Sequence, residues 1–561
     1  MALPATIRSQ VDPAAVTKVT RLFNNTLGDI LCELIQNARR AGAGLVEIGV
    51  IHLDGMDWLS IADDGAGIAD PSVVLALGRS GWDEAIARRE DPAGMGVFSL
   101  AGREAQIISS PRAEGHGWSI RIASGDWQSG APISVVAGNH RAGTEIRVAM
   151  DPQWPPILMA AAQNAARHCP ITVRLDGKDL LREDWLKGAE TIVAAHGVRV
   201  GLYRNYLHRH FSPSINFHGV TVASLLPTVS EKDRHWSAKV DIVDAPDLQL
   251  VLPARKEMVE NAALAALRDA VRLAIYRHIH ALGSHRLGFT LWEEAAGLGV
   301  TLPEARAELL SWSPAVADQN GGAGRHSIID TADLVLVDDF GAPLEQCAAF
   351  ALARDGSLEG RLAEPDEAMR GYGWYDRLPR IVDLRFEIER DGEVSELGGP
   401  DFPGLESGPV DRLELILSLE GPEPARIRLP APVAIEYDDG LFWGFEEANI
   451  LIASPVAITP HDLVDLLDGA CFSASDDKDA DSWDTQHDRF LLDAQEMATR
   501  LLLGDDAALV ERFRAILSYR TQWFVPEGRQ FVAVVGRNSL DIRLEAAEPA
   551  VATIAPVAEA E

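Results

Sequence analysis

The stretch that decides the fold is Asp63-Asp64-Gly65-Ala66-Gly67-Ile68, which directly follows a predicted strand. Two glycines one residue apart let the backbone turn tightly and come close to a flat ligand. A carboxylate at the end of a strand can accept a hydrogen bond from an exocyclic amine such as that of adenine. The same residues also fit a plain Asp-Gly turn, so the interpretation depends on the motifs around them.

A helix is predicted upstream, from Thr26 to Ala41, with Thr26 as its N-cap and apolar residues at helical spacing along one side. Glu33 and Asn37 lie four positions apart, so they share one face of this helix. A carboxylate can orient and deprotonate a water molecule, and an amide oxygen suits magnesium held between phosphates. Polar residues at this spacing are also common on ordinary helix faces.

Two further motifs follow. Gly94-Met95-Gly96-Val97 precedes a helix-compatible segment, where exposed backbone N–H groups can bind phosphate oxygens. The length of 71–93 suits a mobile lid, with Arg79 as a candidate for its basic residue. Gly143-Thr144 opens a predicted strand, and Thr144 can reach the adenine side of the pocket. Each motif is weak when taken alone.

Together, the four motifs resemble those of the GHKL ATPases in order and approximate spacing. This superfamily includes the ninety-kilodalton heat-shock chaperones, MutL, type II topoisomerase ATPase subunits and histidine kinases. ELIQNA resembles the N box, DDGAGI the adenine-binding box, GMG the glycine-rich lid box and GTEIRV the strand that closes the pocket. The resemblance implies a Bergerat α/β sandwich within residues 1–150 that binds ATP and Mg²⁺.

The resemblance also implies a role for individual residues. Glu33 would be the general base and Asn37 the Mg²⁺ ligand, while Asp63 would bind the adenine amine together with Thr144. Many relatives carry an acidic residue one turn after the asparagine, where this chain has Arg40, and no role is assigned to it. The remaining implied contacts to the nucleotide are Gly65, Gly67 and Ile68 at the base and Gly94, Met95, Gly96 and Val97 at the phosphates.

Residues 151–290 resemble the transducer domain that follows the ATPase domain in several of these families. The segment 252–258, LPARKEM, is similar to the catalytic-loop segment of the chaperones. By that resemblance either Arg255 or Lys256 would contact the terminal phosphate, as a catalytic residue supplied from the second domain. A solvated, charged helix start fits the same residues equally well.

The predicted fold class is α+β, because one long helix leads into a hairpin-rich sheet. An acidic α/β region of unknown role is expected at 291–540 and a disordered tail at 541–561. Residues 1–290 come to a net charge of −1, so residues 291–561 carry −32 of the total of −33. Such a charge repels phosphate backbones and favours a protein client over nucleic acid, although a solvated acidic surface is the simpler interpretation.

The sequence favours a cytoplasmic protein with no membrane contact. No stretch approaches the roughly 20 apolar residues of a membrane span, and no signal-peptide core is apparent at the start. The four cysteines are far apart and form no CxxC pair, which fits a reducing compartment.

The expected activity is slow ATP hydrolysis by a chaperone-like conformational clamp that forms a homodimer when nucleotide is bound. Three alternatives stay open: a MutL-like or topoisomerase-like ATPase in DNA metabolism, a kinase of the same fold, and a module that holds ATP without turnover. An intact Glu33 favours turnover over simple binding.

Overall fold

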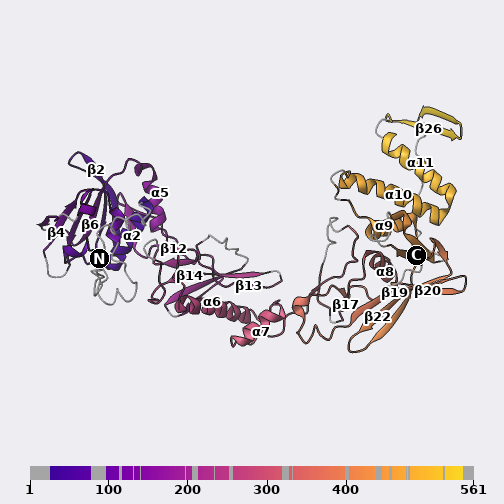
Figure 1. The fold of residues 1–561 in the computed structure, drawn as a ribbon, viewed down its shortest axis with the longest axis horizontal. Helices are drawn as coiled ribbons and strands as arrows, with labels where there is room; N and C mark the ends of the chain where they lie inside the picture. Colours follow the sequence, from indigo (N-terminus) through magenta and orange to yellow (C-terminus); the bar gives the residue numbers. More distant parts are fainter. Residues whose placement is uncertain are drawn as a thin grey trace, which may run out of the picture. The chain divides into compact units, whose positions relative to one another are not determined.

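The computed structural model divides into two compact units, Met1–Ala305 and Arg306–Glu561. Each unit has its own hydrophobic core and is described separately (Figure 1). The described residues are 26–76, 96–112, 116–129, 132–138, 140–195, 197–204, 213–232, 234–251, 257–318, 327–331, 333–398, 404–437, 445–453, 458–475, 477, 480–521 and 525–546.

The long helix near the start of the first unit is confirmed as α2 (Leu27–Arg40). Thr26 caps it, since its hydroxyl oxygen accepts a hydrogen bond of 3.2 Å from the Asp29 N–H. The apolar stripe is buried, including Ile30 and Leu31, which are both fully inaccessible. This burial fixes the rotation of α2 about its axis and therefore the direction in which its polar residues point.

The first sheet has eight strands in the order β5-β4-β3-β6-β2-β1-β7-β8. Its centre is the antiparallel pairing of β2 with β1 and β6. Helix α5 (Pro155–Ala166) packs beside α2 in the same core. The strands are β1 (Leu45–Leu53), β2 (Met56–Asp63), β3 (Ala105–Ser110), β4 (Trp118–Ile122), β5 (Val135–Ala137), β6 (Gly143–Ala149), β7 (Thr172–Leu175) and β8 (Lys178–Asp179), joined by η1 (Pro71–Val73), η2 (Gly96–Leu100) and α4 (Asp126–Ser129).

This sheet runs past residue 150, where the sequence placed the end of the first domain. β7 pairs in parallel with β1, aligning Val173 with Val46, and both side chains are buried in the first core. Parallel strands need a crossover, and the segment containing α5 supplies it. The first sheet therefore ends near residue 180 and not at residue 150.

A second sheet completes the first unit, with the order β12-β11-β14-β10-β9 and β13 beside β14. Helix α6 (Ala262–Ala281) lies along one face of it (Figure 1). Asn261 caps α6 by accepting a bond of 2.9 Å from the Leu264 N–H. The other elements are β9 (Thr191–Ala195), β10 (Val198–Arg204), β11 (Ile215–Phe217), β12 (Val220–Val222), β13 (Val229–Ser230), β14 (His235–Ile242) and α7 (Phe289–Gly297).

The second unit is a mixed sheet, β18-β17-β19-β22-β23, covered by helices and joined in one core by the short sheet β21-β25-β24. The C-terminal region is thus α/β as predicted. Its elements are β15 (Leu309–Leu310), β16 (Ile328–Ile329), β17 (Val335–Val337), α8 (Ala342–Asp355), β18 (Leu362–Ala363), η3 (Glu367–Met369), β19 (Arg380–Arg390), β20 (Glu393–Leu397), β21 (Gly408–Val410), β22 (Arg412–Glu420), β23 (Ala425–Pro430), β24 (Val433–Glu436), η4 (Phe445–Glu447), β25 (Asn449–Ala453), α9 (Pro460–Cys471), α10 (Trp483–Leu503), α11 (Asp505–Thr521), β26 (Arg529–Gly536) and β27 (Ser539–Ala546).

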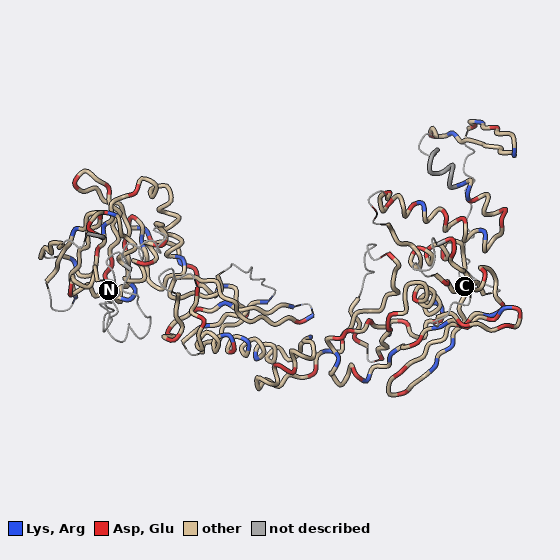
Figure 2. The backbone as a smooth tube through the Cα atoms, viewed as in Figure 1, with Lys and Arg blue, Asp and Glu red and all other residues tan. Residues whose placement is uncertain are grey.

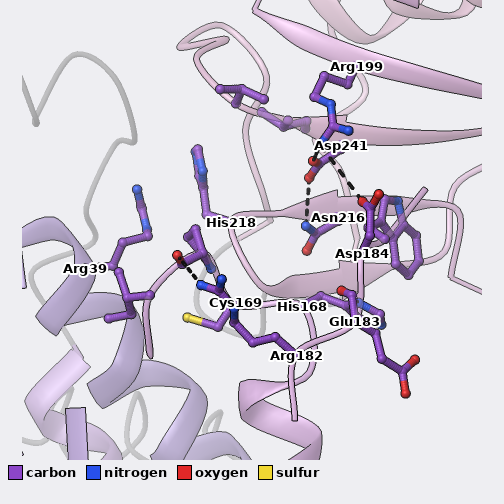
Figure 3. A pocket seen from close by; sticks show the side chains of 15 residues that line it. Arg39, His168, Cys169, Arg182, Glu183, Asp184, Arg199, Asn216, His218 and Asp241 are labelled. Atoms are coloured by element: carbon purple, nitrogen blue, oxygen red, sulfur yellow. Dashed lines mark hydrogen bonds and ion pairs between the residues drawn. The ribbon is translucent and has the colours of Figure 1, made fainter. Parts of the chain in front are cut away.

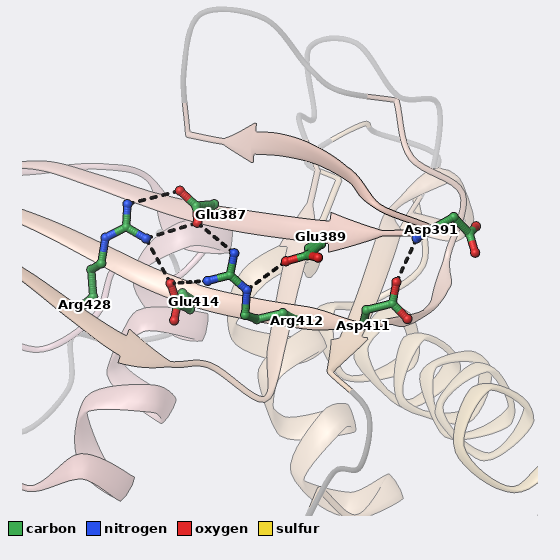
Figure 4. Close-up of polar contacts among 7 residues, drawn as sticks. All are labelled: Glu387, Glu389, Asp391, Asp411, Arg412, Glu414 and Arg428. Atoms are coloured by element: carbon green, nitrogen blue, oxygen red, sulfur yellow. Dashed lines mark hydrogen bonds and ion pairs between the residues drawn. The ribbon is translucent and has the colours of Figure 1, made fainter.

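Part of the acidic charge of the second unit is paired on the surface of its own sheet (Figure 4). Arg428 bridges Glu387 and Glu414 at 3.0 Å each, and Arg412 also contacts Glu414 at 3.0 Å. These arginines hold the pKa of Glu387 below its usual range, with the Arg428 hydrogen bond as the largest cause. Figure 2 shows many further acidic positions in this unit outside this cluster.

The end of the chain differs from the predicted disordered tail over its first part. β27 pairs with β26 as far as Ala546, so 541–546 is a strand, and 547–561 lies outside the described residues. Within the described part of the chain, none of the helices is long and apolar enough to cross a membrane.

Candidate functional site

Asp63 ends β2 and begins the loop that decides the fold. Its Oδ1 accepts a hydrogen bond of 2.8 Å from the Gly65 N–H. Burial raises the pKa of Asp63, and hydrogen bonds from the backbone of Gly65 and Thr144 oppose that rise. A carboxylate has about four acceptor positions. Asp63 can therefore accept a further donor from a ligand.

Two glycines in and beside this loop are required by close backbone contacts. Gly67 has φ of +73°, and a Cβ there would lie 2.4 Å from the Ser110 carbonyl oxygen. Gly143 has φ of +111°, and its Cβ would lie 2.1 Å from the Asp63 carbonyl oxygen. A larger residue at Gly67 would push the loop away from β3, and one at Gly143 would push it away from β6. The glycines therefore hold Asp63 beside the start of β6, where Thr144 lies.

Ser109 joins the remaining residues of this group. Its hydroxyl accepts a bond of 2.8 Å from the Ile68 N–H and lies 3.1 Å from the Thr144 hydroxyl. The Ile68 carbonyl in turn accepts a bond of 2.8 Å from Trp118. The sequence analysis missed Ser109, because only its place on β3, paired with Thr144 on β6, brings it to the loop.

The loop lies against the C-terminal end of α2. The Ala66 N–H donates to the Ala41 carbonyl at 2.8 Å, and a Cβ on Gly65 would lie 2.7 Å from the Ala41 Cβ. Asn37 precedes Ala41 by one turn, and its carbonyl accepts the Ala41 N–H at 2.9 Å. The structure thus places the Asp63 loop beside the helix that carries Glu33 and Asn37.

Glu33 is buried at 8% exposure, and Asn37 on the same face of α2 is half-buried. Arg40, which had no assigned role, donates to the Asn37 side-chain oxygen at 3.2 Å and to the Gln36 side-chain oxygen at 3.3 Å. Gln36 also donates to the Phe217 carbonyl on β11 at 3.3 Å. A hydrogen-bonded path therefore connects Asn37 to the second sheet.

The neighbouring carboxylate, Asp64, differs from Asp63 because it bonds to the backbone at the start of β1. Its Oδ1 accepts the N–H groups of Gly44 at 2.8 Å and Leu45 at 3.0 Å, and Arg112 donates to its backbone carbonyl. Burial alone would raise the pKa of Asp64, but the backbone N–H donors and the nearby charge of Arg112 hold it below its usual range. Asp64 therefore anchors the loop to the start of β1.

Some of the predicted site residues cannot be placed. Gly94, Met95, Arg79, Arg255 and Lys256 lie outside the described residues. Gly96 and Val97 begin η2, which packs against α2. On either side of 252–256, the Val251 N–H donates to the Glu257 carbonyl at 2.9 Å.

Comparisons with known proteins give no family. No family model matches the chain, and no curated protein matches it. Among solved structures, it is similar to one described as "Crystal Structure of N terminal domain of a DNA repair protein". That likeness covers 48% of this chain and 99% of the other, with 14% identity and a TM-score of 0.30.

Proposed function

We propose that this chain is an ATP-binding and ATP-hydrolysing conformational clamp of the GHKL type. The observation that supports it most is the convergence of Asp63, the glycine-bounded loop and Thr144 beside the helix that carries Glu33 and Asn37. A half-buried acceptor next to close-packed backbone suits a flat base with an exocyclic amine.

In this proposal each group has one task. Asp63 accepts the adenine amine, and Glu33 orients and deprotonates the attacking water. Asn37 holds Mg²⁺, which would neutralise phosphate charge when bound. Gly94 to Val97 cover the phosphates, and Arg255 or Lys256 contacts the terminal phosphate. Because that last contact depends on triphosphate, it ties hydrolysis to closure of the first unit.

Release of inorganic phosphate from ATP tests the activity directly. The purified chain with Mg²⁺ and γ-labelled ATP should release labelled phosphate and leave the protein unlabelled. Label that is transferred to the protein itself identifies a kinase. Binding without phosphate release identifies a module that only holds nucleotide.

The clamp model predicts a change of mass in solution. A non-hydrolysable ATP analogue with Mg²⁺ should convert the 60.7 kDa chain into a species of about twice that mass, because triphosphate orders the lid and closes the dimer. Static light scattering with ADP as the control measures it. An unchanged mass at a saturating concentration of the analogue argues against the clamp model. It does not argue against the proposed ATPase activity.

Arg40 should compete with Mg²⁺ at Asn37, since a cation 3.2 Å from the ligand oxygen repels a second one. Arg40→Met should therefore lower the Mg²⁺ concentration for half-maximal hydrolysis by roughly 3–10-fold, as expected from removing a like charge at a partly buried site. A Mg²⁺ titration at fixed ATP measures it, with Arg40→Lys keeping the wild-type value. A higher Mg²⁺ requirement in the methionine variant would mean that Arg40 helps to bind phosphate.

The acidic residues of the second unit indicate what kind of client the clamp would bind. The residual negative charge outside the Arg412 and Arg428 cluster favours a protein with a basic surface over nucleic acid. Affinity isolation with the hydrolysis-deficient Glu33 variant and ATP is the way to trap that client.

A further inference from the structure

A cavity of about 620 Å³ lies within the first unit, between the end of α2, the segment after α5 and the second sheet (Figure 3). Its volume is typical of small-molecule sites. Arg39 of α2 lines it, and lies two positions, or about 200°, around the helix from Asn37. The cavity is therefore separate from the proposed nucleotide site.

One wall of the cavity is an internally paired network. Asp241 accepts hydrogen bonds from Asn216 at 2.7 Å and Arg199 at 3.2 Å, and Arg199 lies 4.0 Å from Asp184. Burial raises the pKa of Asp241, while Asn216 and Arg199 oppose the rise. This wall presents carboxylate oxygens that can accept from a donor on a ligand.

The other wall is basic. Arg39 from α2 and Arg182 from the segment after β8 both lie near Cys169, and His168 and His218 stand beside them (Figure 3). Arg182 donates to the Pro170 carbonyl at 2.8 Å. Cys169 is 4% exposed, and burial raises the pKa of its thiol despite both arginines. Glu183, which follows Arg182 in the chain, also lines the cavity, and neither the neutral thiol nor the Pro170 carbonyl carries a charge.

His218 is held at the cavity by an uncommon backbone conformation. It forms a two-residue turn with Gly219 between β11 and β12, with φ of +55° and +104° respectively. Such a turn favours asparagine or glycine, and histidine is among the few other residues that adopt positive φ more often than average. A Cβ on Gly219 would lie 3.1 Å from the Cys169 Cα, so the turn packs directly against the basic wall.

We propose that this cavity binds a small phosphate monoester that carries a donor group. The phosphate dianion would lie between Arg39 and Arg182, because two guanidinium groups match its charge and geometry. The donor end, an ammonium or hydroxyl group, would reach Asp184 or Asp241. In a chain of net charge −33, two arginines lining one cavity give a local site for an anion.

The cavity also lies next to the hydrogen-bonded path that connects Asn37 on α2 to Phe217 on β11. His218 follows Phe217, whose carbonyl accepts the Gln36 side chain, and Arg39 precedes Arg40, which donates to Asn37. A bound phosphate monoester would contact residues next to both ends of this hydrogen-bonded path, His218 and Arg39. A shift of either residue would move Asn37 and change the rate of ATP hydrolysis. This coupling rests on the proposed ATPase function, whereas the binding itself does not.

Isothermal titration calorimetry with O-phosphoethanolamine tests the binding. The full chain carrying Asp63→Asn is titrated without Mg²⁺, so that neither the proposed adenine contact at Asp63 nor a metal-held phosphate at Asn37 contributes to binding. Binding of one molecule per chain is expected, and Arg182→Ala and Arg39→Ala should each weaken it by roughly 10–100-fold, the usual value of a hydrogen bond to a charged group. Ethanolamine should not bind, and glycerol 3-phosphate, which keeps a hydroxyl donor, should bind with comparable strength.

Arg204→Ala is the matched control, since Arg204 pairs with Glu190 and does not line the cavity. Its affinity should equal that of the parent chain. Absence of phosphoethanolamine binding, or equal binding by the Arg39, Arg182 and Arg204 variants, overturns the proposal. If the Asp63→Asn chain still binds ATP while phosphoethanolamine binding depends on Arg39, the nucleotide assignment fails and the cavity proposal stands.

Discussion

Glu33→Ala is expected to lower the rate of ATP hydrolysis by roughly 10²–10⁴-fold, the usual contribution of a general base. Nucleotide affinity should stay within a few-fold of the parent value, because the carboxylate acts on water and makes no contact with adenine. Phosphate release under saturating ATP measures the rate, and equilibrium dialysis with ATP measures the affinity.

Two comparisons make this test specific. Glu33→Gln keeps the size of the buried side chain and removes only its basicity, so it should lose as much activity as alanine does. Melting temperatures of both variants show whether the helix is intact. A Glu33→Gln enzyme with the parent rate would show that another group activates the water.

Asp63→Asn should abolish detectable nucleotide binding at micromolar ATP. The substitution replaces a charged acceptor with an amide and removes a bond worth about 1.5–3 kcal/mol, or roughly 10–100-fold in affinity. A misdirected amide N–H facing the adenine amine adds a further penalty. Binding of a fluorescent ATP analogue reports the loss.

Asp64→Asn is the matched control, one residue along the same loop. The Asn oxygen can still accept the Gly44 and Leu45 N–H groups that Asp64 holds now, so the loop should keep its position. This variant should bind nucleotide normally. Equal losses in both variants would mean that the loop was disturbed and that Asp63 has no special contact with the base.

The local elements of the first unit could be predicted because their signals are short-range. The Thr26 cap sets the start of α2, and the Asp54-Gly55 turn separates β1 from β2. Asp54 and Gly55 both have positive φ, as a tight hairpin turn requires. The grouping of Asp63, Gly67 and Thr144 was likewise predictable from motif order.

Other features depend on contacts between residues far apart in the sequence. The parallel pairing of Val46 with Val173 extends the first sheet, and no local pattern marks it. The Gln36 bond to the Phe217 carbonyl joins α2 to β11 across 181 positions of sequence. The cavity joins Arg39 to Arg182 across 143 positions of sequence, so it is visible only in the fold. In 291–540, short strands such as β17 and β18 carry too few residues for a periodic pattern.

The burial of α2 on several sides makes its length as important as its composition. Inserting one residue after Ile35 would turn everything downstream by about 100° and shift it by about 1.5 Å. Gln36 would then miss the Phe217 carbonyl, Arg39 would leave the cavity, and Ala41 would no longer meet the Asp63 loop. Relatives of this chain should therefore keep the number of residues between Thr26 and Ala41 constant.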